Sequence, residues 1–399
     1  MEQPMIYADN AATTKTSPAA RQAMLDAMER FWGNPSSLHT PGQQAREALQ
    51  TAREAVARAI GAQPREICFT SGGSEADNQA IVSAARVGAK KGKKHLVTTA
   101  IEHHAVLHTM DQLSKEGFEV TLIPVDESGI VKAEDVAASL REDTALVSVM
   151  FANNEIGTIQ PVAEIGALCR ERGVPFHTDA VQAVGHLPID VNAQNIDMLS
   201  LSGHKFHGPR GVGALYVRRG APLLPFIHGG AQESGRRAGT ENLPAILGMA
   251  AALEDSLAHM EENSAHAAAL RDALIEKLSH IPHAALNGHR ERRLPGNVSF
   301  CFEGIEGESL LLLLDDKGIA ASSGSACTSG SLDPSHVLLA IGRPHEVAHG
   351  SLRLTLDRSN TMEEVEAIAE AAKEVVTYLR GMSPVWKALQ RGERSYVIQ

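Results

Sequence analysis

Short runs of apolar and β-branched residues alternate with longer stretches of helical spacing through the first half of the chain. Stretches such as 75–88, 105–116 and 162–172 carry apolar residues every three to four positions. Strands separated by helices of this length need crossover connections, so the pattern predicts an α/β fold with a mostly parallel seven-stranded sheet. The expected strands are residues 67–70, 95–99, 119–124, 145–150, 175–179, 197–202 and 213–217.

The pattern changes after residue 240. Residues 243–278 have the spacing of long helices, and 362–380 of a further helix, whereas 297–302, 319–322 and 352–356 resemble strands. This half therefore predicts a smaller α+β unit, and the tail after residue 381 shows little pattern. No repeat or low-complexity linker separates the two parts, so we expect them to pack tightly.

Composition excludes several classes of protein. The chain has 399 residues, enough for two domains, and its formal charge of −11 argues against nucleic acid as the main partner. The N-terminus lacks a basic stretch followed by an apolar run, so no signal peptide is expected. The longest apolar stretches fall far short of the roughly 20 residues that cross a bilayer. We expect a cytoplasmic protein without membrane association.

Residues 200–211 (SLSGHKFHGPRG) place Lys205 directly after a predicted strand, beside two histidines. Ligands of open α/β sheets bind beyond the carboxyl ends of the strands. A lysine in a dry pocket or near another cation has a lowered pKa and becomes an amine nucleophile or base. A lysine in a surface loop is the simpler alternative, and a lone Lys205 would favour it.

Asp179 ends another predicted strand, and Gln182 follows it by one turn. An aspartate in this place is suited to keep a pyridinium nitrogen protonated, which makes the ring an electron sink. Gln182 is placed to donate to an oxygen on such a ring. The alternative for Asp179 is a helix N-cap before residues 180–184.

Residues 70–78 (TSGGSEADN) join a strand to a helix through two glycines, which suits a phosphate cradle built from backbone N–H groups. Ser74 with Asp77 is equally consistent with a capping box. His103 and His104 follow the next strand, and one of them is placed to lie flat on a cofactor ring. A metal site would require them to meet His204 and His207, and since no cysteine or carboxylate spacing supports this, no metal is expected.

The cysteines fall into two kinds. Cys68, Cys169 and Cys301 lie in strand or helix patterns and are expected to be buried core thiols. Cys327 lies in the polar stretch 322–331 (SSGSACTSGS), where an exposed thiol would suit a nucleophile. The alternative is an accidental surface cysteine. None of the four forms a CxxC pair, so neither a zinc site nor a disulfide framework is expected.

These segments together resemble the NifS/IscS family of cysteine desulfurases, and more closely its NifS-like branch, within the fold-type I pyridoxal 5'-phosphate (PLP) enzymes. The resemblance includes residues 7–14 (YADNAATT), 33–37 (GNPSS), 236–242 (RRAGTEN) and 351–354 (SLRL). It implies that L-cysteine is converted to L-alanine and that sulfur passes to an enzyme cysteine persulfide. Such sulfur would supply iron–sulfur cluster assembly or other thio-cofactor and tRNA pathways.

The resemblance also implies a role for individual residues. Lys205, His103 and Cys327 would be catalytic: the lysine bonds to PLP, the histidine stacks on its ring and moves protons, and the cysteine receives sulfur. Arg353 and Asn154 would bind the substrate. The cofactor would contact residues that the family motifs match: Gly73, Ser74, His103, Asn154, Asp179, Gln182, Ser202, His204, Lys205 and Thr240.

The family pattern further predicts a large PLP-binding domain over residues 15–260 and a small domain formed by 1–14 and 261–399, with the cysteine loop at about 322–331. Thr240 would reach the cofactor of a neighbouring subunit, which implies a homodimer. A NifU- or IscU-like scaffold, or another acceptor, would receive the sulfur. Ser234 and Asp357 depart from the residues that many relatives carry there.

Two alternatives remain open. Another fold-type I activity, an aminotransferase or a selenocysteine-directed lyase, would keep Lys205 and Asp179 but would need no thiol. A catalytically silent PLP-binding scaffold or regulator would need neither Lys205 nor Cys327. The product of the reaction, alanine or a keto acid, distinguishes the first alternative from a desulfurase.

Overall fold

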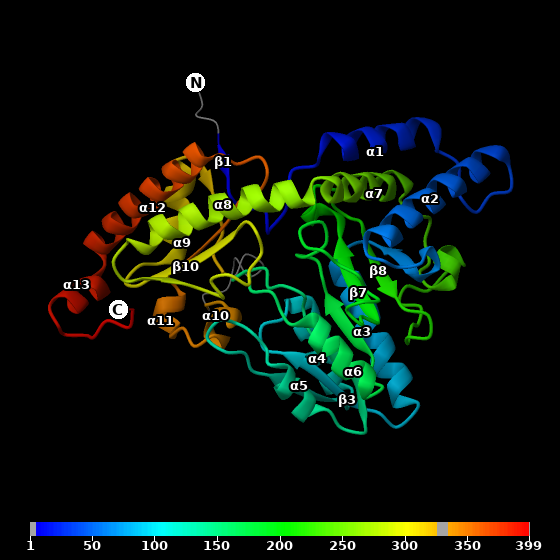
Figure 1. The fold of residues 1–399 in the computed structure, drawn as a ribbon, viewed down its shortest axis with the longest axis horizontal. Helices are drawn as coiled ribbons and strands as arrows, with labels where there is room; N and C mark the ends of the chain where they lie inside the picture. Colours follow the sequence, from blue (N-terminus) through cyan, green and yellow to red (C-terminus); the bar gives the residue numbers. More distant parts are fainter. Residues whose placement is uncertain (1–4, 325–333, 399) are drawn as a thin grey trace.

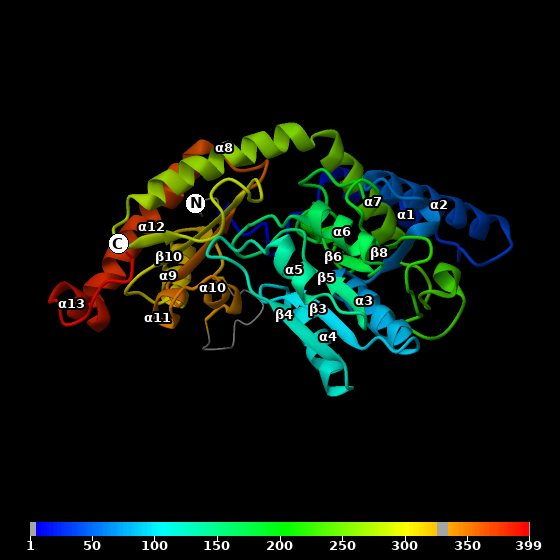
Figure 2. The same cartoon turned by 60° about the horizontal axis from the view of Figure 1, so that its bottom comes forward.

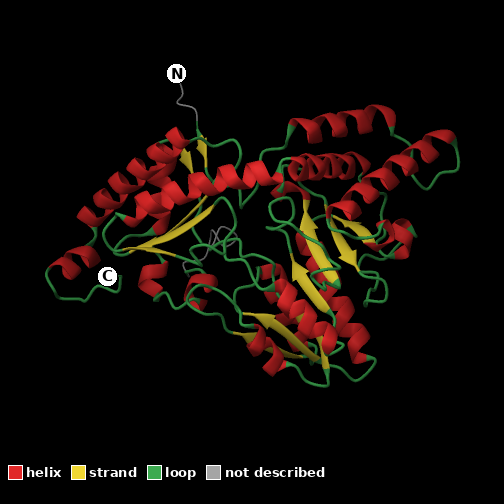
Figure 3. Ribbon diagram, in the orientation of Figure 1, coloured by secondary structure: helices red, strands yellow, loops and turns green. Residues whose placement is uncertain are grey.

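A computed structural model describes residues 5–324 and 334–398, and Figure 1 shows them arranged as two bodies joined along one side by long helices. The larger body contains the seven-stranded sheet, and the smaller contains the C-terminal third of the chain with the N-terminal strand. Figure 3 shows helices on the outside of both bodies.

The large sheet has the strand order β2-β8-β7-β6-β5-β3-β4. Strand β8 runs antiparallel to both of its neighbours, β2 and β7, and the other neighbouring pairs are parallel. The predicted mostly parallel seven-stranded sheet is therefore confirmed. The strands are β2 (Ile67–Thr70), β3 (His95–Thr99), β4 (Glu119–Ile123), β5 (Thr144–Ser148), β6 (Phe176–Asp179), β7 (Met198–Ser202) and β8 (Gly213–Val217).

Helices cover both faces of this sheet because its strands are apolar on both sides. On one face, Leu96 and Leu215 pack with helices α3 and α4, while on the other Val97 and Tyr216 pack with α2, α6 and α7. The bounds are α1 (Pro18–Arg30), α2 (Thr40–Ala59), α3 (Gly73–Ala89), α4 (His104–Lys115), α5 (Ala133–Ser139), α6 (Val162–Glu171) and α7 (Leu243–Ala258).

The smaller body is built on two short sheets. Strand β1 pairs in parallel with β11, and β10 lies between β12 and β9 with antiparallel pairing. Their strands are β1 (Ile6–Tyr7), β9 (Ala284–Leu286), β10 (Asn297–Phe302), β11 (Ile319–Ala320) and β12 (Ser351–Thr355). The helices are α8 (Met260–Ser279), α9 (Gly307–Asp316), α10 (His336–Ala340), α11 (His345–Ala348), α12 (Met362–Met382) and α13 (Pro384–Gln390).

Helix α8 connects the two bodies. A single residue, His259, separates it from α7, and Figure 2 shows it running from the larger body over the smaller one. Its residues Leu274 and Leu278 pack into the core of the smaller body together with Leu354 and Val376. Among the described residues, no helix has the length and apolar character needed to cross a membrane.

Candidate active site

Lys205 lies where the N-terminal segment crosses the carboxyl edge of the large sheet. It ends a short 3₁₀ turn (Gly203–Lys205) that follows β7. Its Nζ donates to the carbonyl oxygens of Ala11 (2.6 Å) and Ala12 (2.9 Å), and the Gln182 side chain also donates to Ala11 (3.0 Å). The half-buried amine is thus held by backbone carbonyls, which excludes the surface-loop alternative for Lys205.

Asp179 is the last residue of β6, and its side chain is buried. Its Oδ1 accepts the backbone N–H of Val181 at 2.9 Å, as an N-cap side chain does, although turns rather than a regular helix follow. Burial raises the pKa of Asp179, while His103, the Val181 hydrogen bond and Lys205 oppose that shift. The three ionisable side chains therefore share one electrostatic environment.

The first turn of α3 forms a cradle beside Asp179. A Cβ atom on Gly73 would lie 2.5 Å from Cγ2 of Val181, so only glycine permits this approach of helix and loop. No side chain caps α3, and Asp77 is buried with a raised pKa, so the capping-box alternative is wrong. Backbone N–H groups at such a helix start, together with the helix dipole, suit a phosphate.

Ser202 and His204 lie next to this cradle. Ser202 is the last residue of β7, and a Cβ atom on Gly72 would be 3.8 Å from its hydroxyl oxygen. His204 contacts the Thr13 hydroxyl at 3.1 Å through Nδ1. Burial, then Lys205 and Arg210, lower the pKa of His204 to about 4, so its imidazole is neutral near neutral pH. A neutral ring can donate a hydrogen bond to an anion without adding charge.

His103 caps α4 through Nδ1, which accepts the N–H of Ala105 at 3.1 Å. Its side chain and Ser74 line one groove between α3 and α4. His104 instead packs against the rings of His108 and His336, at 4.9 and 4.7 Å between centroids. In residues 5–324 and 334–398, no group of three metal-binding side chains could hold an ion.

Arg353 joins the two bodies at the predicted substrate site. Its guanidinium donates to the Asn154 carbonyl (3.3 Å) and pairs with Asp9 (3.0 Å). Its Nε is buried and has no hydrogen-bond partner within the described residues. Its backbone pairs with Ser322, at the start of the predicted cysteine loop. The structure therefore brings Asn154, Arg353 and the start of that loop together.

Thr240 and the four cysteines complete the set of predicted residues. Cys327 lies outside the described residues, and Thr240 is exposed before α7. Cys68, Cys169 and Cys301 are fully buried, and burial raises their thiol pKa to about 12, about 12 and about 11. The prediction that these three are core thiols is confirmed.

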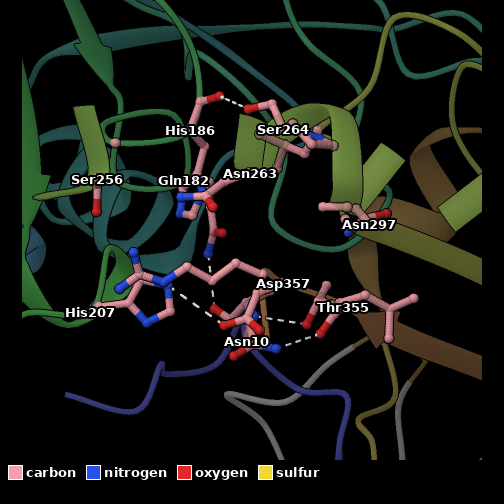
Figure 4. A pocket seen from close by; sticks show the side chains of 18 residues that line it. Asn10, Gln182, His186, His207, Ser256, Asn263, Ser264, Asn297, Thr355 and Asp357 are labelled. Atoms are coloured by element: carbon pink, nitrogen blue, oxygen red, sulfur yellow. Dashed lines mark hydrogen bonds and ion pairs between the residues drawn. The ribbon is translucent and has the colours of Figure 1, made fainter. Parts of the chain in front are cut away.

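A small cavity of about 70 Å³ lies between the two bodies behind the Lys205 loop. Of the predicted site residues, Gln182 lines it (Figure 4). On its wall His207 faces Asp357, with Nε2 and Oδ2 3.6 Å apart. Asp357, which departs from the family pattern, therefore connects the small body to the loop that carries Lys205.

Sequence reasoning did not identify the buried carboxyl groups around the site. Burial raises the pKa of Glu102 to about 8 and of Glu155 to about 7. Both follow predicted strands, as the identified residues do, and Glu155 directly follows Asn154. Position after a strand was the available signal, but burial of the side chains cannot be deduced from it.

The donor set fits PLP. The structure offers a partly buried amine at Lys205, a buried carboxyl at Asp179, and an uncapped helix start at Gly73. At Gly73 a Cβ atom would collide with Val181. These groups match the aldehyde, the ring nitrogen and the phosphate of the cofactor, respectively.

Comparison with known proteins agrees with this fit. Residues 6–368 match the family model described as aminotransferase class-V. A cysteine desulfurase IscS from Methanosarcina thermophila is 54% identical and covers 96% of this chain and 95% of its own, and one from Clostridium botulinum is 53% identical, with 96% and 97% covered. A solved NifS-like protein superposes with a TM-score of 0.89 at 39% identity, covering 94% of this chain and all of its own. A structure described as SspA in complex with cysteine has a TM-score of 0.79 at 38% identity, with 89% and 100% covered.

Proposed function

Because the chain belongs to the aminotransferase class-V family, we propose that it is a PLP-dependent cysteine desulfurase that releases L-alanine and places sulfur on Cys327. The observation that carries this proposal is the meeting of Lys205, Asp179 and the α3 start at one sheet edge, in a chain 54% identical to a cysteine desulfurase. Aminotransferase class-V enzymes and the homologous cysteine desulfurases depend on PLP.

The cofactor contacts that we propose are those implied by the family motifs, and the arrangement of Lys205, Asp179 and the α3 start supports them. Lys205 would bond to the cofactor aldehyde, and Asp179 would hold the proton on the ring nitrogen. Gly73 and Ser74 of α3, with Ser202 and His204, would bind the phosphate, and Thr240 would contribute from a partner subunit. His103 would stack on the ring, while Gln182 and Asn154 would hydrogen-bond at its edge.

When bound, PLP supplies an aldehyde that bonds to amines and a ring that draws electrons from the substrate Cα. Arg353 would bind the cysteine carboxylate through its planar fork of donors, which suits a carboxylate. Lys205, as the free amine, would then remove the Cα proton. His103, whose side chain lines the α3–α4 groove, would act as an acid or base in the later proton transfers.

The sulfur step needs a thiolate at Cys327. The thiolate attacks the substrate sulfur, so a new S–S bond forms as the substrate Cβ–S bond breaks. The electron pair of the broken bond stays with the three-carbon fragment, which takes up protons and leaves as alanine. An unperturbed thiol has a pKa of about 8.5, so deprotonation of Cys327 must be assisted in the site.

The persulfide would be delivered to another protein in the cytoplasm. A NifU- or IscU-like scaffold for iron–sulfur cluster assembly is the proposed acceptor, and the relatives named IscS and NifS-like support it. The three described cysteines are free, in keeping with a reducing compartment. The proposed active form is a homodimer.

Cys327→Ser tests the proposal. Since a hydroxyl is a poor nucleophile toward sulfur, we expect this variant to bind cysteine, seen as a change in cofactor absorbance, but to release almost no alanine. After brief incubation of the unmutated protein with cysteine, mass spectrometry should find extra sulfur on Cys327. The buried Cys68, Cys169 and Cys301 serve as internal controls. Normal alanine release by the variant, or a keto-acid product, would refute the assignment.

A further inference from the structure

One oxygen of Glu155 lies between the two chain segments that flank residues 325–333. The hydroxyl of Ser335 donates to Oε2 of Glu155. A Cβ atom on Gly324 would lie 3.0 Å from the same oxygen and 3.2 Å from Cβ of Ser335. A single carboxyl group therefore packs against the chain both before and after the segment that contains Cys327.

Glu155 and Ser335 each make further hydrogen bonds. The backbone N–H of Glu155 donates to Oδ1 of Asn153 at 2.8 Å, and its carbonyl accepts from Asn297 at 3.3 Å. The Ser335 hydroxyl also accepts the N–H groups of Val337 (3.1 Å) and Leu338 (3.3 Å), which caps α10. A displacement of Ser335 away from Glu155 would therefore also disturb the start of that helix.

From this arrangement we propose that Glu155 is a positioning residue for sulfur transfer. It fixes Gly324 and Ser335, and hence the two ends of the segment carrying Cys327, relative to the loop that presents Asn154. This inference rests on the proposed function, since it assigns to Cys327 the role of sulfur acceptor. We assign Glu155 no contact with either substrate or cofactor.

The charge state of Glu155 links this position to pH. Burial raises its pKa to about 7, whereas the Ser335 hydrogen bond, Arg353 and His103 lower it. Arg353 belongs to β12 and His103 to the start of α4, so the two side chains that lower this pKa come from both bodies. An ionised carboxylate accepts a stronger hydrogen bond than a neutral carboxyl. The contact with Ser335 should therefore strengthen as pH rises through 7.

Ser335→Ala removes the contact and leaves the site residues unchanged. We expect kcat for alanine release to fall about tenfold, because a misplaced reacting group loses rate steeply, while KM for cysteine and the cofactor absorbance stay unchanged. Ser335→Thr, which keeps a hydroxyl, should recover most of the rate. Ser383→Ala is the matched control, because Ser383 caps α13 in the same way and does not touch Glu155.

Glu155→Gln tests the dependence on charge. The amide keeps the shape and an acceptor oxygen, so the ratio of wild-type to variant kcat should be near one at about pH 6 and rise through about pH 7. A flat ratio, a change in KM alone, or an equal loss in Ser383→Ala would overturn the inference. The alkylation rate of Cys327 in Ser335→Ala is read independently of turnover. An alkylation rate equal to that of the wild type would refute the positioning role of Glu155. Absence of alanine release by the wild-type protein would instead refute the proposed function, so the two failures can be told apart.

Discussion

At the scale of single residues, the site is surrounded by carboxyl groups that are removed from water. Glu102 is fully buried: its Oε1 accepts from the Thr99 hydroxyl (2.7 Å) and the Met150 N–H (2.9 Å), while Oε2 has no partner within the described residues. Burial disfavours the charged form and raises the pKa of Glu102 to about 8. At neutral pH the folded protein therefore holds a proton that the unfolded chain has released.

This proton has a predictable effect on stability. Between about pH 4.5 and about 8, only the folded state is protonated at Glu102, so its contribution to stability falls as pH rises, by up to about 1.4 kcal/mol per pH unit. Glu102→Gln removes that slope, and its melting temperature relative to the wild type should rise from acid to alkaline pH. Parallel thermal scans measure the difference. A difference that does not vary with pH would show that Glu102 is ionised in the folded state.

The bond between Lys205 and PLP can be tested directly. If its amine bonds to the cofactor aldehyde, borohydride reduction of the protein with PLP should attach the pyridoxyl group to Lys205. Lys205→Ala should lose the lysine-linked absorbance and the activity but still bind PLP weakly through the α3 cradle. Peptide mapping by mass spectrometry reads the position. A pyridoxyl group on another lysine would mean that the whole site is wrongly assigned.

At the scale of elements, the close approach of α3 to the loop after β6 sets the cradle. A methyl group on Gly73 would displace Val181, which follows Asp179 by two residues. Overpacking of this kind costs about 1–3 kcal/mol, so Gly73→Ala should weaken PLP binding about tenfold. Equilibrium titration of the cofactor measures this.

The matched control is Gly381→Ala in α12. A Cβ atom there meets nothing within 4 Å, so alanine should leave PLP affinity unchanged and stabilise the helix by up to about 1 kcal/mol. Equal loss of affinity in both variants would mean that the close contact at Gly73 does not form the cradle.

The elements that the sequence predicted are those with a clear period. Strands of the large sheet were placed within one or two residues, because their apolar runs are bounded by turn residues. Helix α13 was not predicted, since its start depends on Ser383 and Pro384 within a short polar tail. The site residues after strands were identified by position, whereas the contacts of Glu155 with Ser335 and of Arg353 with Asp9 join residues 180 and 344 positions apart. No local pattern encodes such contacts.

At the scale of the whole molecule, ion pairs and a helix hold the two bodies together. Arg358 of the smaller body pairs with Asp255 of α7 at 2.8 Å, and Asp357 faces His207.

At the far end of the larger body, the turn after α1 exposes large apolar side chains: Trp32 is 73% exposed and Leu38 84%. Between them, Pro35 and Ser36 line the same groove as Glu241, the neighbour of Thr240.

Because these exposed apolar side chains lie near a residue predicted to serve a partner subunit, we propose this surface as the dimer face. If the proposed homodimer forms through this surface, the double variant Trp32→Glu, Leu38→Glu should dissociate it, because burying two charges at the interface opposes association by several kcal/mol. Because Thr240 is expected to reach the partner's phosphate, PLP affinity should fall with it. Sedimentation velocity with and without PLP measures both effects.

Leu312→Glu is the control, since Leu312 is 72% exposed on α9 of the smaller body. This variant should change neither the association state nor the affinity for PLP. A double variant that remains dimeric, or a monomer that keeps full PLP occupancy, would place the subunit contact elsewhere and remove Thr240 from the cofactor site.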